Sequence, residues 1–281
     1  PDQRGVSLRF RVLGSGSTGN ATLVEGGGVR ILLDAGLGPR ELAERLQSVG
    51  VDPASVDALF LSHEHGDHAR GAVSFSRKWG VRICGSRGTY AAMGLGAEDF
   101  AGYDVLEPEK PRAVGSLTVR GVPVPHDAAG PYAFVVSNGS ASLGHATDFG
   151  HVNRSFVDSF RDCDAVLVES NHDPDLLRRG DYPWTLKERI LGPRGHLSNQ
   201  DVARFVAHGL AETCRSLVLA HLSQKNNHPD LALDCTFGAL QRRGRSEVEV
   251  TITGEDGTGW IDVGAPPPPG QSGGGKQLRL F

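Results

Sequence analysis

Short apolar runs recur along the chain, and most of them stop at a polar side chain next to a turn. Helices are expected between some of these runs, at about 39–48, 69–79, 199–210 and 231–242, with Ser198 or Asn199 as the N-cap of the third. A strand at 247–253 is expected to close the ordered domain. An alternation of strands and helices along one chain predicts an α/β fold. The clearest runs, which have the length of buried β-strands, are 29–33, 56–61, 117–122, 165–169 and 216–220.

Polar side chains at the ends of the predicted strands are the candidates for a functional site. Ligand sites of α/β sheets gather at strand ends, so side chains that leave several strands there can meet. Several histidine and acidic residues in this position are a stronger signal together than any one alone. The residues concerned are Asp34, His63, His126, Asp148, Glu169 and His221.

The segment 62–68 reads Ser-His-Glu-His-Gly-Asp-His and directly follows the apolar run at 58–61. His63 and His65 are two residues apart and therefore project from the same side of an extended segment. Asp67 and His68 are adjacent, so they project in different directions and could serve a second ion. Imidazole nitrogen and carboxylate oxygen are the donors that suit zinc and its first-row neighbours. This spacing predicts a metal site.

Composition and charge narrow the functional classes only a little. With 38% apolar and 22% charged residues among 281, the chain has the composition of an ordinary soluble globular protein. It has no signal-peptide pattern, no apolar run near the roughly 20 residues that span a bilayer, and four cysteines without a CxxC pair. We therefore expect a cytoplasmic protein with reduced thiols and no membrane association. The net charge of −4 gives no global attraction to nucleic acid, so binding a polyanion would need a local basic patch.

The strand-end residues and the 62–68 segment together resemble the motifs of the metallo-β-lactamase superfamily, over about residues 8–255. The resemblance implies a four-layer αβ/βα sandwich of the α/β class with a two-metal site between its sheets. The implied ligands are His63, His65 and His126 for one ion, Asp67, His68 and His221 for the other, and Asp148 as the bridge. Asp34 would lie behind the ligands and orient a metal-bound histidine.

Finer motifs look like those of the WalJ (YycJ) group of bacterial nucleases within this superfamily. The placement of His196 and His221 is also similar to that of the transfer-RNA 3′-end processing endonuclease, whose long flexible arm has no obvious counterpart here. Asp148 and His221 are only 73 positions apart, too few for the large insert of the β-CASP nucleases. How a nucleic acid would be gripped is therefore left open. The motifs are Gly-Ser-Gly-Ser-x-Gly-Asn (14–20), Glu-Ser-Asn-His-Asp (169–173), Gly-His-Leu-Ser-Asn (195–199) and His-Leu-Ser (221–223).

A two-metal site of this kind suits phosphodiester hydrolysis. Two ions on one face can activate a water and neutralise the phosphate oxygens as charge builds in the transition state. We expect Asp67 and Asp148 to hold the nucleophile side, and His196 to donate a hydrogen bond or proton to the reacting phosphate. His145 and His151 are expected to be structural or surface residues. His172 is expected to be either a donor near the site or a helix cap.

The composition changes from Gly264 onwards, which predicts a hydrolase domain at 1–263 and a flexible Pro/Gly linker at 264–276. The chain then ends in Gln-Leu-Arg-Leu-Phe at 277–281. This peptide looks like the short motif by which bacterial replication and repair proteins dock on the DNA sliding clamp. Such tethering would raise the local concentration of an acidic enzyme on DNA. The residues that would contact the clamp are Gln277, Leu278, Leu280 and Phe281.

These features predict a two-metal phosphodiesterase that acts on DNA, as a 5′-to-3′ exonuclease of repair or replication that is tethered to the sliding clamp. An RNA-processing nuclease of the same fold and a small-molecule hydrolase, such as a cyclic phosphodiesterase or thioesterase, are the alternatives. A binding-only module is disfavoured because the full ligand set is present. Zinc and manganese are both compatible with the histidine and aspartate ligands.

Overall fold

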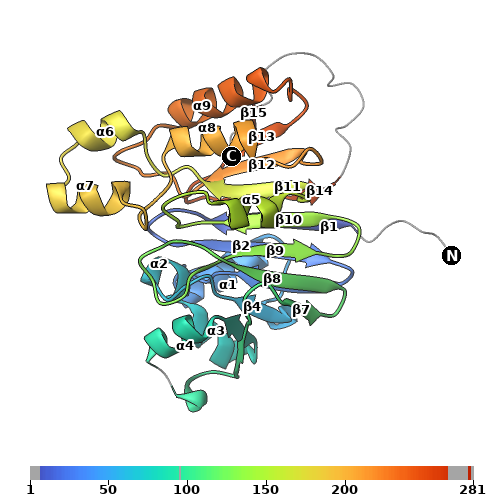
Figure 1. Cartoon of the computed structure of the whole chain (residues 1–281). Helices are drawn as coiled ribbons and strands as arrows, with labels where there is room; N and C mark the ends of the chain where they lie inside the picture. Colours follow the sequence, from blue (N-terminus) through green and yellow to red (C-terminus); the bar gives the residue numbers. More distant parts are fainter. Residues whose placement is uncertain (1–6, 95, 265–277, 280–281) are drawn as a thin grey trace.

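The computed structural model describes residues 7–94, 96–264 and 278–279, and within that range two β-sheets face each other (Figure 1). The first sheet contains seven strands in the order β14-β1-β2-β3-β4-β5-β6. β14 is antiparallel to β1, and the strands from β3 to β6 run parallel. The strands are β1 (Leu8–Gly14), β2 (Ala21–Gly26), β3 (Val29–Leu33), β4 (Ala58–Phe60), β5 (Arg82–Gly85), β6 (Tyr103–Val105) and β14 (Ile261–Val263).

The second sheet contains eight strands, again within the described range, in the order β15-β13-β12-β11-β10-β9-β8-β7. Its strands from β10 to β13 run parallel, and those from β7 to β10 form antiparallel pairs. The strands are β7 (Pro111–Val114), β8 (Leu117–Pro123), β9 (Tyr132–Ser137), β10 (Ser142–Ala146), β11 (Ala165–Glu169), β12 (Ser216–Ala220), β13 (Glu249–Ile252) and β15 (Leu278–Arg279).

Helices cover the outer face of each sheet. α1 (Pro39–Ser48) and α3 (Ala72–Trp79) pack on the first sheet. The second sheet is covered by α5 (Arg154–Phe160), α8 (Asn199–His208) and α9 (Pro229–Arg242). The other helical segments are α2 (Gly66–Ala69), α4 (Arg87–Met93), α6 (Pro174–Arg179), α7 (Trp184–Leu191) and the 3₁₀ turns η1 (Pro53–Ser55) and η2 (Ala97–Asp99).

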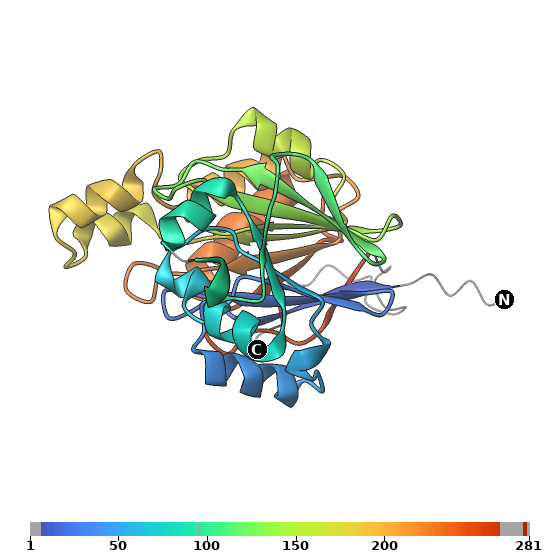
Figure 2. The same cartoon turned by 90° about the horizontal axis from the view of Figure 1, so that it is seen from below.

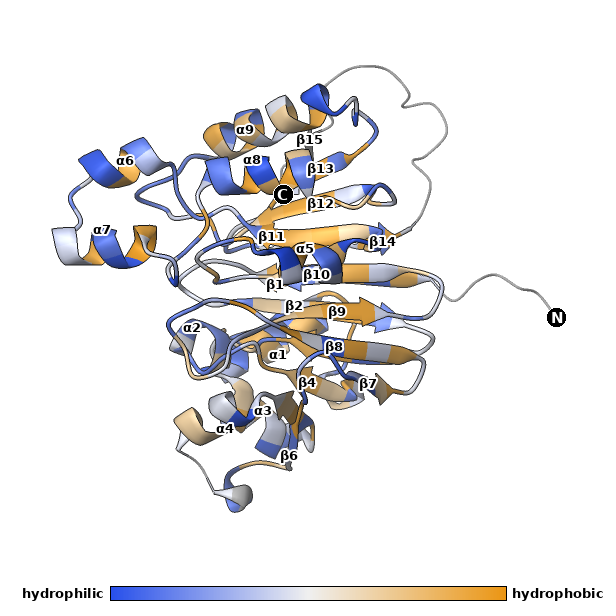
Figure 3. Ribbon diagram, viewed as in Figure 1, coloured by the Kyte–Doolittle hydropathy of each residue, from blue (hydrophilic) through white to orange (hydrophobic). Residues whose placement is uncertain are grey.

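Alternation along the strands explains why the protein has two sheets with apolar residues on both faces. In β3, Ile31 and Leu33 belong to the cluster between the sheets, whereas Leu32 belongs to the cluster under α1 and α3. Successive side chains of a strand point to opposite faces, so a continuous apolar run builds two layers at once. Figure 3 shows this apolar character concentrated in the central strands. The four-layer sandwich predicted from the resemblance is confirmed.

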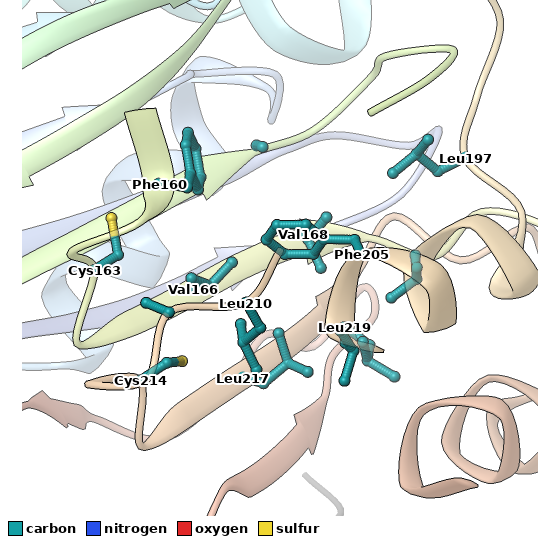
Figure 4. Close-up of a cluster of buried hydrophobic side chains, with 14 of the residues drawn as sticks. Phe160, Cys163, Val166, Val168, Leu197, Phe205, Leu210, Cys214, Leu217 and Leu219 are labelled. Carbon is teal, nitrogen blue, oxygen red and sulfur yellow. The ribbon is translucent and has the colours of Figure 1, made fainter. Parts of the chain in front are cut away.

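The outer layer on the second sheet follows the same rule. Val166 and Val168 of β11 lie in the cluster below the helices, while Leu167 between them faces the other sheet. Leu219 of β12 and Phe205 of α8 belong to the same outer cluster (Figure 4). All five side chains are 2% exposed or less, so this layer is a fully buried part of the core.

Two boundaries differ from those expected. The helix predicted from about Ala69 to Trp79 is split into α2 and α3 around Gly71. A Cβ atom at Gly71 would lie 2.4 Å from the carbonyl oxygen of Leu37, so the chain passes too close there for a side chain. The strand β13 was expected to close the domain, but β14 follows it and pairs with β1.

A helical arm, formed by α6 and α7 with the turn between them (174–191), was not foreseen. Figures 1 and 2 show the two helices side by side and projecting from one end of the sandwich. Many of its residues are polar and exposed, which Figure 3 shows most clearly for α6. Helices of six and eight residues are too short to give a clear apolar period in the sequence.

The described part of the C-terminal tail is β15, which lies parallel to β13 with Leu278 opposite Val250. The predicted linker beyond Gly264, together with Gln277, Leu280 and Phe281, lies outside the described residues. Among the described helices, none combines the length and apolarity that crossing a bilayer requires.

Candidate metal centre

The metal loop begins where β4 ends, and backbone hydrogen bonds hold it against neighbouring strands. Leu61 N–H donates to the carbonyl of Cys84, and Ser62 N–H donates to Oδ1 of Asp34 at 2.8 Å. The segment then turns into α2, for which His65 is the N-cap residue. This turn from extended chain to helix directs His63 and His68 into the interior, where both are 1% exposed or less.

Three histidines from two loops form the first cluster. Ligand-capable nitrogens of His63, His65 and His126 all lie within 4.8 Å of one another. His126 comes from the loop after β8, and its Nε2 is 3.4 Å from Nδ1 of His65. The His126 ring is fixed from behind, because its Nδ1 lies 3.1 Å from the carbonyl oxygen of Gly195. Three imidazoles in this arrangement are a common zinc ligand set.

The second cluster combines two carboxylates and two imidazoles. Ligand-capable atoms of Asp67, His68, Asp148 and His221 also lie within 4.8 Å of one another. Asp148 Oδ2 is 2.6 Å from Nε2 of His68, and Asp148 Oδ1 is 2.6 Å from Nδ1 of His221. Asp148 Oδ2 is also 3.5 Å from Nε2 of His63, so this carboxylate borders both clusters.

Three residues of the site have a backbone conformation that side chains rarely adopt. The φ angles of Asp34, Asp148 and His221 are 63°, 56° and 54°. Asp34 and His221 directly follow a strand and Asp148 lies two residues after one, and a left-handed residue there turns the chain sharply. Left-handed non-glycine residues cost free energy and cluster at functional sites. Within the described chain, Glu109 is the one other non-glycine residue with a positive φ.

The residues of both clusters fit divalent metal ions. Nε2 of His63 and Nε2 of His221 are buried, and neither has a hydrogen-bond partner in the described part of the chain. Buried polar atoms are almost always paired, so such orphaned nitrogens indicate a ligand. Nitrogen and carboxylate oxygen donors suit zinc and other first-row ions.

Opposite charges are strongly coupled in the second cluster. Burial disfavours a charged His68, but the carboxylates of Asp148 and Asp34 outweigh it and raise the pKa of His68 to about 10. Burial also opposes ionisation of Asp148, yet His221 and His68 hold the pKa of Asp148 well below its usual value. The carboxylate is therefore ionised and available to a cation at neutral pH.

Asp34 lies behind the second cluster rather than in it. Its Oδ2 is 2.8 Å from Nδ1 of His68 and also accepts a hydrogen bond from Ser62 Oγ at 2.8 Å. This contact sets the orientation of the His68 ring and leaves Nε2 directed at Asp148. Asn20 Nδ2 approaches the same Nε2 to 3.1 Å, which connects the 14–20 turn to the site.

Glu169 was noted as a strand-end residue but was given no role, and the structure places it at the centre of a third group. Its Oε2 is 3.0 Å from Nδ1 of His196, and its Oε1 accepts hydrogen bonds from the N–H groups of Phe149 and Leu197. Glu169 is completely buried, which disfavours its charged form, but His196 beside it holds the pKa of Glu169 down to about 2. Its position at the end of an apolar strand was the signal that could have identified it.

His196 stands at the edge of the second cluster, with its Nδ1 3.3 Å from Asp148 Oδ1. Burial lowers the affinity of its ring for a proton, but Glu169 and Asp148 together raise the pKa of His196 to about 10. Because Nδ1 faces these carboxylates, Nε2 is the nitrogen that can meet a substrate. The side chain is 22% exposed, so solvent and ligands can reach it.

A cavity of about 240 Å³ opens over both clusters. Its floor includes His65, Asp67, Asp148, His196 and His221, and one wall is supplied by the helical arm. The volume lies below the roughly 300–1,000 Å³ typical of pockets that enclose a drug-sized ligand. A phosphodiester group with part of one nucleotide suits a cavity of this size.

The remaining histidines lie outside the clusters. His145 is buried, and its Nε2 is 3.1 Å from Oγ1 of Thr22 on the facing sheet. His151 is exposed, with its Nδ1 2.9 Å from the carbonyl of Pro193. His172 is buried and does not cap a helix, because the side chain of Asp173 accepts the N-terminal hydrogen bonds of α6. The capping alternative for His172 was therefore wrong.

Curated relatives match most of the chain. Exodeoxyribonuclease WalJ of Streptococcus pneumoniae serotype 2 (strain D39) is 33% identical over 231 residues, which cover 81% of this chain and 86% of that protein. Exodeoxyribonuclease YycJ of Bacillus anthracis is 32% identical over 241 residues, which cover 85% of this chain and 91% of that protein. The expectation that the chain resembles the WalJ (YycJ) group is confirmed.

The fold also matches solved structures. The metallo-beta-lactamase fold protein YhfI of Bacillus subtilis aligns with a TM-score of 0.67 at 20% identity, over 92% of this chain and 99% of that one. The sequence matches the Metallo-beta-lactamase superfamily over residues 14–196. Together with the ligand clusters, these matches identify a metal-dependent hydrolase that uses divalent cations. The chain belongs to the metallo-beta-lactamase superfamily.

Proposed function

We propose that this protein is a two-metal phosphodiesterase that degrades DNA as a 5′-to-3′ exonuclease. The observation that carries the proposal is the position of Asp148, whose oxygens lie 2.6 Å from a histidine on each side and 3.5 Å from the three-histidine cluster. A carboxylate with this placement can bridge two ions. The names of the relatives, both exodeoxyribonucleases, support DNA as the substrate.

In this proposal one ion is held by His63, His65 and His126, and the other by Asp67, His68 and His221, with Asp148 between them. Zinc and manganese both suit these donors. Such ions, when bound, lower the pKa of water and neutralise negative charge on a phosphodiester.

The protein's own side chains supply the proton chemistry. Glu169 holds His196 through Nδ1 and keeps the imidazole protonated at neutral pH, so that Nε2 carries a proton toward the cavity. A protonated histidine there can donate to the phosphate or to the departing oxygen. Asp67 is partly exposed at the cavity floor and orients the attacking water together with Asp148.

A metal-reconstitution assay tests this function. The protein is stripped of metal, and Mn²⁺ or Zn²⁺ is restored separately before addition of end-labelled duplex DNA, single-stranded DNA or structured RNA. Metal-dependent release of mononucleotides from 5′ ends of DNA is the expected result. His65→Ala and Asp67→Ala should abolish release while the circular dichroism spectrum remains that of the unaltered protein. Cleavage of RNA alone would reject the DNA assignment, and cleavage of no nucleic acid would favour a small-molecule hydrolase.

We further propose that the C-terminal peptide tethers the enzyme to the DNA sliding clamp in repair or replication. Gln277, Leu278, Leu280 and Phe281 would make the contact, through a Pro/Gly linker at 264–276. Deletion of 277–281 should leave hydrolysis of short DNA unchanged and eliminate binding to immobilised clamp in surface plasmon resonance. Equal clamp binding by the full-length and truncated chains would reject the tether.

A cytoplasmic location completes the proposal. All four cysteines are free thiols, and Cys84, Cys163 and Cys214 are buried. Burial raises the pKa of each of these three thiols to about 12, so they are unreactive at neutral pH. Free thiols without disulfides suit a reducing compartment.

A further inference from the structure

The helical arm forms one wall of the cavity over the metal clusters. Tyr182, Leu186, Arg189 and Ile190 of the arm line this cavity, opposite Asp67 and Ser17. The arm projects beyond the sheets (Figures 1 and 2), so its part in the site is to contact whatever extends out of the cavity.

The two faces of α7 differ in their surroundings. Leu186, Arg189 and Ile190 recur at spacings of three and four residues, which places them on one face, toward the cavity. Trp184 precedes Leu186 by two residues, about 200° around the helix, and is therefore on the opposite face. It is 60% exposed, and its Nε1 donates a hydrogen bond to Glu188 at 2.8 Å.

The cavity-facing side of the arm is attached to the loop after β8 that carries His126. Arg189 forms an ion pair with Asp127, the residue after His126. Just after the arm, Arg194 Nε donates to the carbonyl oxygen of His126 at 3.0 Å. These contacts hold the wall at a set distance from the metal clusters, so that Tyr182 is a fixed contact surface.

A lysine lies beside Tyr182. Lys225 Nζ lies 5.6 Å from the centroid of the Tyr182 ring, and Lys225 is itself exposed. Arg179, at the end of α6, and Arg194, three residues after α7, are exposed and have no ion-pair partner among the described residues. Lys225 thus supplies positive charge at the ring, and the two arginines supply it before and after the turn and α7, where a chain of net charge −4 needs local cations to bind a polyanion.

We propose that Tyr182 stacks on the base of an unpaired nucleotide next to the scissile phosphate, making the arm a subsite for single-stranded DNA ends. In this proposal the phosphate of the reacting nucleotide occupies the cavity of about 240 Å³, and its unpaired base lies outside against the arm. An aromatic ring next to a cation is a combination that binds single strands without sequence preference. This inference rests on the proposed DNA hydrolase activity and specifies the form of its substrate.

The test compares four forms of the metal-loaded enzyme: unaltered, Tyr182→Ala, Tyr182→Phe and Trp184→Ala. Each is given a 5′-labelled single strand and the same strand with an abasic tetrahydrofuran residue at its 5′ terminus. KM and kcat are measured for release of the first nucleotide, and Kd is measured by fluorescence anisotropy. Trp184→Ala is the matched control because it removes an aromatic ring from the opposite face of the same arm.

Tyr182→Ala should weaken binding of the normal strand by roughly 5- to 100-fold in Kd and KM, the range for loss of one stacked base. Tyr182→Phe and Trp184→Ala should stay within about twofold of the unaltered enzyme. On the abasic strand the penalty of Tyr182→Ala should disappear, since the base that the ring contacts is missing. An equal penalty on both strands, or an equal penalty for Trp184→Ala, would overturn the assignment of Tyr182.

This experiment distinguishes failure of the Tyr182 subsite from failure of the proposed nuclease function. If the unaltered enzyme cleaves DNA and Tyr182→Ala changes neither KM nor Kd, the subsite is rejected and the nuclease assignment stands. If the enzyme binds the strand through Tyr182 but never cleaves it, the subsite is supported and the nuclease assignment is rejected. Absence of both binding and cleavage rejects both.

Discussion

Oε2 of Glu169 lies 3.0 Å from Nδ1 of His196, although the two residues are 27 positions apart in the chain. Glu169 ends β11, and His196 follows α7 in the loop that leads into α8. The carboxylate is completely buried and also receives two backbone N–H groups, which keep it in place. Because Glu169 is paired with Nδ1 of His196, Nε2 is the ring nitrogen that faces the cavity, and the carboxylate favours a proton on it.

Glu169→Gln should therefore change the pH dependence of hydrolysis. Glu169 and Asp148 together raise the pKa of His196 to about 10, so removal of the Glu169 charge should lower that pKa toward its ordinary range. His196 would then lose its proton at lower pH than in the unaltered enzyme, so kcat at pH 8 should drop, by up to roughly 30-fold if the pKa returns fully to its ordinary value. Below pH 6 the variant should approach the unaltered enzyme. The measurement is a pH–rate profile with metal content determined in parallel, and Glu188→Gln on the arm is the control. Parallel profiles for the unaltered enzyme and Glu169→Gln would show that Glu169 does not act through His196.

Asp34→Asn should weaken metal binding without unfolding the protein. Asparagine tolerates the left-handed backbone at this position, but it removes the charge that faces His68 Nδ1 at 2.8 Å. Loss of such an outer contact typically lowers metal affinity about 10- to 100-fold. Competition with a chromophoric chelator measures the affinity. Asp57→Asn, at an exposed carboxylate that accepts from Arg30 N–H, is the matched control and should leave it unchanged.

Gly36→Ala should disrupt the metal loop through a backbone collision. A Cβ atom at Gly36 would lie 1.6 Å from the carbonyl oxygen of Asp67, and this backbone atom cannot move independently of the loop. We expect loss of at least one bound ion and a decrease of about 1–3 kcal/mol or more in the free energy of unfolding. Gly38→Ala, where nothing lies within 4 Å of the added atom, should behave as the unaltered protein. Metal analysis and urea denaturation of the two variants give the comparison, and full metal content in Gly36→Ala would contradict the prediction.

His145→Gln should alter the acid sensitivity of the fold. Burial lowers the pKa of His145 to about 4, so in the folded state it is neutral at pH values where the unfolded chain binds a proton. Its contribution to stability is complete above about pH 6.5 and is lost as pH falls toward 4. The difference in unfolding free energy between the unaltered protein and His145→Gln should shrink by about 2 kcal/mol from pH 7.5 to pH 5. Denaturant titrations at both pH values measure it, with exposed His151 changed to Gln as control. A constant difference would mean that His145 binds protons equally in the folded and unfolded states.

Several local features of the chain could be predicted from the sequence alone. The spacing of His63, His65, Asp67 and His68 fits a strand that turns into a helix. The apolar run before this turn and the glycine within it can both be seen in the sequence. The helix at Pro39–Ser48 has the predicted bounds, since proline favours the first turn of a helix. Ser198 caps α8, as the Ser-Asn pair there suggested.

The assembly of the site depended on contacts between distant residues. Asp148 and His68 are eighty positions apart, and their 2.6 Å contact exists because two sheets pack face to face. From residues alone, Asp148 was one of several carboxylates at strand ends and could bridge two cations, and the resemblance singled it out as the bridge between the two ligand sets. Glu169 could not be told apart from the other strand-end carboxylates, because its partner His196 is distant in the sequence.

The helical arm could not be predicted from the hydrophobic pattern of the sequence. Its helices are short and polar, so neither shows the apolar period by which longer helices such as α8 are recognised. Tyr182 has no motif around it, and it gains a place in the cavity only because Arg189 and Arg194 attach the arm to the loop that carries His126. Hydrophobic periodicity and ligand spacing are short-range properties that a sequence displays directly. The distance between a wall and a metal cluster is set by the packing of whole layers, and it exists only once the chain has folded.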